Sequence, residues 1–375
     1  MKIGKLNFKD YAAQKPIAVL PSGKFISVRD FISQPSLCLG SLFALDNNLQ
    51  LDLALKRYEM EPDFELGIID IGAFTKNEII NHIRNQSELG RMALRAEIAY
   101  CNELMASLVG KKIPSSPKMP KPIIPKIPDW KPVKKCLIMR LPTRAVFCEN
   151  TTDPVTTPFT YYRKKYVHPE FRKRGFTVII LEGTEDTRDK FVSHAKNPLT
   201  EYLSGVGHGN YNIYTGHWGN IILEECQYDS KEVKNKAIHF LSCKTAAKLG
   251  PDTVKKGARC YAGYTENFIL VWDERQTRID EFNLFPESDS VFDIMMARGA
   301  TAKEAFEAAI NAFNFAINKV PNTVAATYLT WDREHLKLIG NPSAKIKPYR
   351  FVKICFPIKP LERQDALVEA GTLED

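Results

Sequence analysis

EYLSGVGHG, residues 201–209, is a short apolar run that ends in Gly-His-Gly. A second run, AIHFLSC at residues 237–243, is also apolar and ends in a cysteine. Short aliphatic runs bounded by turn residues are typical of buried strands. We therefore predict two strands that each end in a side chain capable of chemistry, a histidine after the first and a cysteine after the second.

Further strands are predicted on both sides of these two. The segments are CLIMRLPT at 136–143, FTVIILEGT at 176–184 and ARCYAGYT at 258–265. Polar stretches with helical character separate the strands, and Thr301 with Glu304 forms a capping box that predicts a helix start. Apolar strands alternating with crossovers indicate an α/β fold, with a mostly parallel central sheet flanked by helices.

Residues 1–110 have a different pattern, typical of a small, mainly helical module. Leu94, Ile98, Cys101, Met105 and Leu108 follow helical spacing and form one apolar seam, and residues 47–58 predict another helix. Packing between two helices explains the seam, and a self-association or partner-docking surface is the alternative. The predicted divisions are the module at 1–110, a linker at 111–135, the α/β domain at 136–345, and a final strand and tail at 346–375.

The positive charge of the chain is concentrated in the linker. The 375 residues carry a net charge of +8, and residues 111–135 hold eight Lys, one Asp and seven Pro. This composition is typical of an extended, solvated spacer. Because the rest is close to neutral, we predict no specific nucleic-acid partner. A tether to an anionic polymer or membrane surface is the alternative use of the linker.

Composition excludes several classes of protein. Hydrophobic residues are 44% and charged residues 26%, as in a folded globular protein. No apolar run approaches the ~18–20 residues of a membrane span, and the first residues lack the apolar segment of a secretory signal. Eight dispersed cysteines without C-x-x-C pairs or zinc-ligand spacing indicate reduced thiols. We therefore expect a cytoplasmic protein with no metal and no cofactor.

His208 and Cys243 are the candidate reactive pair. If their strands are parallel neighbours, both side chains emerge at the same edge of the sheet, where reactive groups of such folds collect. An imidazole beside a thiol accepts its proton during nucleophilic attack, and the N–H of Gly209 is able to approach a developing oxyanion. Two rival bases are less suited, because His217 falls at a predicted hairpin tip and His239 lies within a strand.

The segments around both residues resemble the caspase-like cysteine peptidases, the superfamily of separase, gingipain and caspase. YLSGVGHGNYNIYTGHWGNIIL resembles the segment in which a strand ends in His-Gly and continues into a small hairpin. IHFLSCKTAAKLGPDTVKKGARCYAGYTENF is similar to the nucleophile segment in its CHAT-domain form, and ARGATAKEAFEAAINAF resembles the helix that closes CHAT domains. The resemblance covers roughly residues 136–320.

The resemblance implies a cysteine endopeptidase that cleaves a protein partner. His208 would be the general base and acid, Cys243 the nucleophile, and the N–H groups of Gly209 and Cys243 the oxyanion hole. No third catalytic group is required by the family. Bacterial proteases of this type serve in defence or programmed death, which implies a regulated zymogen with a regulatory partner at residues 1–110. An inactive caspase-like binding or scaffolding module is the alternative.

Substrate preference depends on residues around the strand ends. Leu241 stands two residues before the nucleophile, where relatives often line the pocket for the residue before the scissile bond, and it forms no salt bridge. Glu266 would suit a basic residue there, and Arg144 an acidic one. The candidate pocket walls are Thr143, Arg144, Tyr264, Thr265 and Glu266. This interpretation requires that the Cys243 thiol be reachable.

Overall fold

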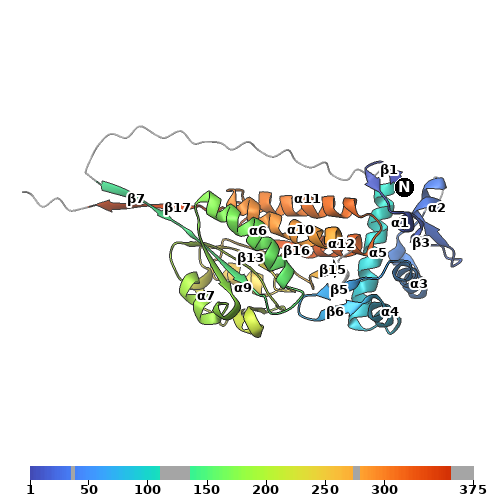
Figure 1. Ribbon diagram of the computed structural model, residues 1–375, viewed down its shortest axis with the longest axis horizontal. Coiled ribbons are helices and arrows are strands. Elements are labelled where there is room, and N and C mark those ends of the chain that lie inside the picture. The colour runs from blue at the N-terminus through green and yellow to red at the C-terminus, as the bar shows by residue number, and fades with distance from the viewer. Residues whose placement is uncertain (35–38, 110–135, 273–278, 356–375) are drawn as a thin grey trace, which may run out of the picture.

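The computed structural model describes residues 1–34, 39–109, 136–272 and 279–355, and its centre is a six-stranded sheet (Figure 1). The strand order is β16-β14-β13-β10-β8-β9, parallel throughout except for the edge strand β16, which runs antiparallel to β14. The predicted α/β architecture is confirmed. The strands are β8 (Arg144–Glu149), β9 (Thr177–Glu182), β10 (Thr200–Val206), β13 (Ala237–Leu241), β14 (Cys260–Tyr264) and β16 (Leu336–Gly340).

Side chains of the sheet alternate between two helical layers, as the two-residue period of a strand requires. Tyr202 of β10 and Leu241 of β13 belong to the core of one face, whereas Leu203 and Phe240 belong to the core of the other. The first face packs against α6 (Thr157–Arg174), α10 (Ile279–Ala297), α11 (Ala302–Lys319) and α12 (Val324–His335). The second packs against α7 (Arg188–Ala195), α8 (Ser230–Val233) and α9 (Leu249–Lys255).

Local sequence signals account for the ends of these helices. Thr301 and Glu304 form the predicted capping box, in which the Thr301 hydroxyl accepts from the Glu304 N–H and the Glu304 carboxylate accepts from the Thr301 N–H. Helix α6 ends at Gly175, whose φ of 94° is the left-handed conformation that a glycine adopts without strain.

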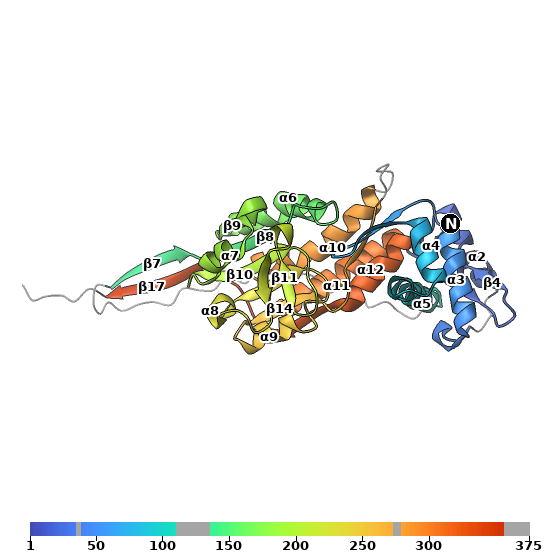
Figure 2. The same ribbon diagram turned by 90° about the horizontal axis from the view of Figure 1, so that it is seen from below.

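One predicted sheet strand is wrong. Residues 136–143 do not enter the central sheet; β7 (Cys136–Pro142) instead pairs with β17 (Tyr349–Cys355) in a two-stranded ribbon that extends from one end of the molecule (Figures 1 and 2). The sheet strand is β8, directly after it. The reason is burial, because the side chains from Ala145 to Glu149 are all buried, whereas those of Met139 and Phe351 in the ribbon are exposed.

The N-terminal region lies at the end of the molecule opposite this ribbon and combines the expected helices with short strands (Figure 2). The predicted helices at 47–58 and along the Leu94–Leu108 seam are present as α3 (Asn47–Glu59) and α5 (Glu88–Leu108). Other elements of this region are α1 (Asp10–Gln14), α2 (Val28–Ser33), α4 (Lys76–Arg84), β1 (Lys2–Ile3), β2 (Leu6–Asn7), β3 (Pro16–Val19) and β4 (Phe25–Ser27). The predicted linker at 111–135 and the tail at 356–375 lie outside the described residues.

A small sheet joins the N-terminal region to the rest of the chain. Strand β5 (Glu65–Ile68) pairs antiparallel both with β6 (Gly72–Thr75) and with β15 (Ile269–Trp272). Strand β15 follows the central strand β14, so the β5–β6 hairpin is held beside the central sheet. One hydrophobic core contains residues of both regions, including Leu66 and Ile69 from the hairpin and Phe268 beside β15.

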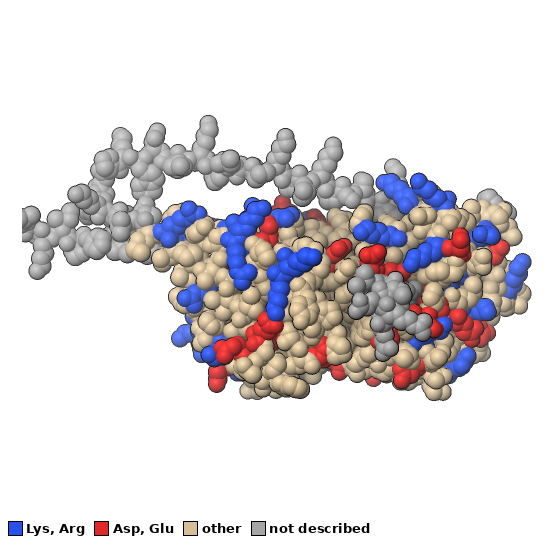
Figure 3. All heavy atoms as spheres, in the orientation of Figure 1, with Lys and Arg blue, Asp and Glu red and all other residues tan. Residues whose placement is uncertain are grey.

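Surface charge is locally uneven. Lys and Arg side chains gather over α6 on the face seen in Figure 3. Within this helix, Lys165, Arg172, Lys173 and Arg174 are exposed. Acidic side chains lie below the basic group on the same face. Within the described ranges, no helix is both long enough and apolar enough to cross a membrane.

Candidate active site

The carboxyl ends of three neighbouring strands are level with one another. Glu149 of β8, Val206 of β10 and Leu241 of β13 are partners in register. Backbone bonds continue the alignment beyond the strands, because the Asn150 N–H donates to the Val206 carbonyl at 2.9 Å and the Gly207 N–H to the Leu241 carbonyl at 3.2 Å. The loops that carry His208 and Cys243 therefore leave the sheet side by side, at the shared edge predicted from the sequence.

Gly209 allows these two loops to touch. A side-chain Cβ at this position would stand 2.7 Å from Cγ2 of Thr245 and 3.2 Å from the carbonyl oxygen of Cys243. Both distances are shorter than ordinary carbon contacts, so glycine is needed for the close approach. The Gly209 N–H is thereby held next to the Cys243 loop.

His208 lies between two aspartates. Its Nε2 is 2.9 Å from Oδ2 of Asp153, and its Nδ1 is 2.9 Å from both the backbone N and Oδ1 of Asp70. Asp153 is itself fixed, because its carboxylate accepts from the backbone N–H and the hydroxyl of Thr156 at 2.9 and 2.7 Å. The histidine ring is therefore held on both sides.

These partners set the protonation of the ring. Burial alone would lower the pKa of His208, but its hydrogen bonds and attraction to Asp153 and Asp70 raise the pKa to about 9. Burial likewise opposes ionisation of Asp153, yet the hydrogen bonds from His208 and Thr156 lower the pKa of its carboxyl to about 2. The raised pKa favours the protonated ring at neutral pH, with one carboxylate on each side, and in the neutral ring Nδ1 accepts from the Asp70 N–H.

The Cys243 thiol is fully buried, contrary to the reachable thiol that the sequence interpretation requires. Its S–H donates to the Ile69 carbonyl at 2.8 Å, and its sulfur accepts from the Phe268 N–H at 3.3 Å. Burial, reinforced by the nearby Asp70 carboxylate, raises the pKa of the thiol well above its ordinary value. The β5–β6 hairpin, which carries Ile69 and Asp70, provides part of this cover.

A single peptide group lies between the thiol and the imidazole. The Ile69 carbonyl oxygen contacts Cys243, and the Asp70 nitrogen of the same peptide group contacts His208. The Gly209 N–H donates to Oδ1 of Asp70 at 2.7 Å. A thiol, an imidazole and an N–H donor thus surround one peptide group, and acyl transfer uses groups of these types.

Two of the expected pocket residues lie elsewhere, which corrects their assignment. Thr143 and Arg144 stand at the amino end of β8, where Arg144 is in register with Thr177 and Thr200 at the starts of their own strands. This is the sheet edge opposite Cys243. The error follows from the misplaced strand at 136–143, which put these residues after a strand instead of before one.

The remaining expected pocket residues lie near the site but differ in exposure. Leu241 is buried in the core, and Tyr264 is buried with its hydroxyl donating to Asp289 at 2.8 Å. Because both side chains are fully buried, neither could contact a substrate in this structure. Glu266 is half-buried, and its carbonyl accepts at 3.1 Å from the N–H of Lys244, the residue directly after Cys243.

The two rival histidines have the expected positions. His217 lies between β11 (Ile213–Thr215) and β12 (Ile221–Glu224), at the tip of their hairpin. His239 is buried within β13. Neither contacts the Cys243 thiol.

Sequence reasoning missed both aspartates. Asp153 follows β8, and placing that strand at AVFCE instead of CLIMRLPT would have put Asp153 at the reactive edge. Asp70 carries no comparable signal, because it lies 138 positions from His208 and reaches it only through the pairing of β5 with β15.

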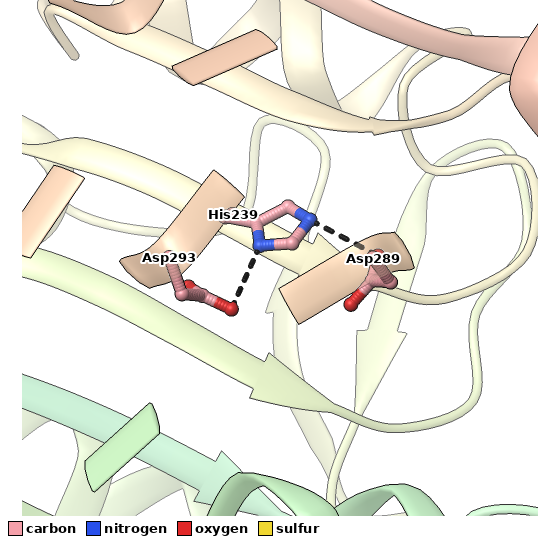
Figure 4. A group of neighbouring side chains, drawn as sticks. All are labelled: His239, Asp289 and Asp293. Atoms are coloured by element: carbon pink, nitrogen blue, oxygen red, sulfur yellow. Dashed lines mark ion pairs between the residues drawn. The ribbon is translucent and has the colours of Figure 1, made fainter. Parts of the chain in front are cut away.

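A second group of titratable side chains lies beneath the sheet, where His239 is flanked by Asp289 and Asp293 (Figure 4). Nδ1 of His239 is 3.2 Å from Asp293, and Nε2 is 3.3 Å from Asp289. Burial opposes protonation, but the two carboxylates raise the pKa of His239 to about 9. Arg163 of α6 completes the cluster by donating to Asp293 at 2.6 Å.

A histidine with two carboxylates is also a set of ligands that could hold a divalent cation, but the surroundings do not suit one. Both oxygens of Asp293 already accept from protein donors: Oδ2 from Arg163, and Oδ1 from Tyr202 and Ser204 at 2.6 and 2.8 Å. A metal here would also stand beside the Arg163 guanidinium. The contacts describe a buried ion-pair network that ties α6, β10, β13 and α10 together.

Solved structures resemble this chain, whereas family models and curated proteins do not. No family model matches the chain, and no curated protein matches it. Among solved structures, a complex of the pro- and mature domains of RgpB from Porphyromonas gingivalis is similar, with 10% sequence identity and a TM-score of 0.38. The match covers 55% of this chain and 48% of that one. The chain thus spans about half of the structure that it matches.

The buried network should be critical for stability. Asp293→Asn keeps the shape of the side chain but removes the charge that faces Arg163 and His239, and breaking a buried pair costs about 3–5 kcal/mol. We expect a loss of that size in the free energy of unfolding, measured with urea. The control is Glu185→Ala, which breaks the exposed ion pair with Lys190 and should cost about 0–1 kcal/mol. Equal effects of the two variants would contradict the assigned role.

His208 should titrate well above free histidine. We expect Asp153→Asn to move its pKa from about 9 toward the ordinary value of about 6.5, measured by NMR of ring-labelled protein. Because the folded pKa is raised, the stabilisation from this pair is complete below pH of about 6.5 and lost as the pH rises through about 9. The stability difference between wild type and Asp153→Asn should therefore shrink over this interval. An unchanged pKa in the variant would contradict the contact.

Proposed function

We propose that the protein is a caspase-like cysteine endopeptidase that cleaves a protein partner, with Cys243 as nucleophile and His208 as general base and acid. The observation that carries the proposal is the bracketing of one peptide group by this thiol and this imidazole. The two side chains come from loops after neighbouring parallel strands, where such folds place their reactive groups. The resemblance of both segments to caspase-like peptidases supports the same assignment.

The geometry supports a separate role in the proposed reaction for each of these groups. Nδ1 of His208 lies next to the peptide nitrogen, so once the ring is neutral this atom takes the proton of the Cys243 thiol and delivers it to the leaving amine. The thiolate attacks the carbonyl carbon, and the N–H groups of Gly209 and Cys243 stabilise the oxyanion. Water then hydrolyses the thioester. Asp153 is a positioning residue, because it holds Nε2 and so orients Nδ1 toward the substrate.

Substrate and pathway belong to the same proposal. Glu266 lies beside the nucleophile loop and would favour a basic residue before the scissile bond. We propose that the enzyme has the CHAT form and belongs to the regulated proteases of defence or cell-death pathways. Support for the pathway comes from the sequence resemblance alone.

A binding or scaffolding module without catalysis is the second candidate. The burial of the Cys243 thiol favours it, since a nucleophile closed off from solvent cannot reach a substrate. The two candidates differ in whether removal of the thiol changes any chemistry. Peptide cleavage therefore separates them.

Cleavage should depend on Cys243 and His208. We expect the full chain, incubated with a proteome-derived peptide library, to generate new N termini in wild type and faster in Asp70→Ala, in which the Gly209 N–H is released. Cys243→Ala or His208→Ala in either background should lower the rate at least about 100-fold. Cys226→Ala is the matched control, because this cysteine is exposed and its thiol contacts Asp252 instead of His208. Unchanged cleavage by Cys243→Ala would refute the peptidase, and no cleavage by any form would favour the binding module.

A further inference from the structure

The β5–β6 hairpin, residues 65–75, occupies the site on which the proposed function depends. We propose that this hairpin is an intramolecular inhibitor that keeps the enzyme latent until the N-terminal region withdraws it. The biological meaning of the inhibition rests on the proposed peptidase function, whereas the placement of the hairpin does not. Three sets of contacts carry the inference.

The first set holds the hairpin along β15. Ile68 is in register with Ile269, and Gly67 with Leu270, in an antiparallel ladder. The ladder continues toward the dyad, because the Ile69 N–H donates to the Phe268 carbonyl at 3.3 Å. An extended peptide recognised by strand addition would need this same edge, so it competes directly with β5.

Gly67 makes the fit specific. A Cβ at this position would stand 1.8 Å from the indole ring of Trp272 on β15, so the indole occupies the space above the glycine. The hairpin therefore lies flat against β15 only because this position lacks a side chain.

The second set of contacts occupies the reactive groups themselves. Cys243 donates its proton to the Ile69 carbonyl, and His208 contacts the Asp70 nitrogen and carboxylate. The Gly209 N–H, which would stabilise an oxyanion, donates instead to Asp70 at 2.7 Å. The carboxylate of Asp70 thus takes the place of the negative oxygen that forms during peptide hydrolysis.

The same contacts explain why the hairpin acts as an inhibitor and not as a substrate. Cleavage after Ile69 would require its carbonyl oxygen to face the Gly209 N–H, but that oxygen faces the Cys243 thiol. Asp70 adopts a φ of 80°, and this turn directs its side chain to the N–H donor. With the donor occupied, the Ile69–Asp70 bond lacks stabilisation of its oxyanion.

The third set links the hairpin to the rest of the N-terminal region. Thr75 ends β6 and caps α4 through a capping box with Glu78. Helix α4 packs against α5, the longest helix of that region. Displacement of α4 therefore pulls on β6, and a ligand or protein that binds the N-terminal region has a direct route to the site.

Thiol alkylation tests the inhibition independently of catalysis. The full-length wild type, Asp70→Ala and Asp70→Asn are treated with iodoacetamide, and mass spectrometry follows labelling of Cys243 against the exposed Cys226 as internal standard. Asp63→Asn is the matched control, because its side chain precedes the hairpin, is 86% exposed and pairs with Lys76 instead of with His208 or Gly209. Thermal unfolding of each variant verifies that it remains folded.

We expect both Asp70 variants to raise the labelling rate of Cys243 at least about tenfold, because each loses charge-assisted contacts to Gly209 and His208. Asp63→Asn should match the wild type. Peptide cleavage should rise in parallel with labelling. Asp70→Asn is the conservative variant, so it yields the result even if Asp70→Ala unfolds.

The outcomes separate the two proposals. Faster labelling together with faster cleavage supports both. Faster labelling without cleavage of the peptide library supports the hairpin as the cover of the site and removes the peptidase function. Labelling of Cys243 at the wild-type rate in both folded Asp70 variants overturns the inhibitor, whatever the cleavage assay shows.

Discussion

The parallel register of β8, β10 and β13 is the constraint on which the rest of the site depends. Because the three strands end at the same level, the loops that carry Asp153, His208 and Cys243 leave one edge of the sheet together. A shift of one residue in any of the three would turn its side chains to the other face and separate the groups. The positions of these side chains therefore depend first on the register of the three strands, and only then on the conformations of the loops.

Beneath that edge, buried charges hold the strands and helices in place. Arg163 of α6 reaches Asp293 of α10 and Ser204 of β10, while His239 of β13 lies between Asp289 and Asp293. Removing charges from water is costly, so such a cluster persists only when its members satisfy one another. This cluster fixes the position of α6 and α10 on the sheet, and thereby the position of the sheet edge that carries His208 and Cys243.

At the sheet edge that carries His208 and Cys243, the protonation of the two side chains is that of an inactive site. The raised pKa of His208 favours a protonated ring between two carboxylates, and Cys243 is a buried, neutral thiol. An imidazolium cannot accept the thiol proton, so chemistry requires a change in these surroundings. Asp70 contributes to the pKa of both groups, and it is attached to a hairpin instead of to the sheet. Withdrawal of the β5–β6 hairpin would therefore uncover the Cys243 thiol, change the pKa of His208 and release the Gly209 N–H at the same time.

Local patterns in the sequence predicted the strands β9, β10, β13 and β14, the capped helix at Thr301 and the candidate pair His208 and Cys243. Such signals are readable because the spacing of apolar residues and the residues at strand ends depend on nearby positions in the chain. They placed His208, Gly209 and Cys243 at one edge and His217 and His239 away from it. Only the tertiary structure decided which of two adjacent runs entered the sheet, and hence that Asp153 joins the site and Thr143 and Arg144 do not. It alone brought Asp70 to His208, since pairing between β5 and β15 depends on the burial of both strands in one core, a property that no local stretch of sequence expresses.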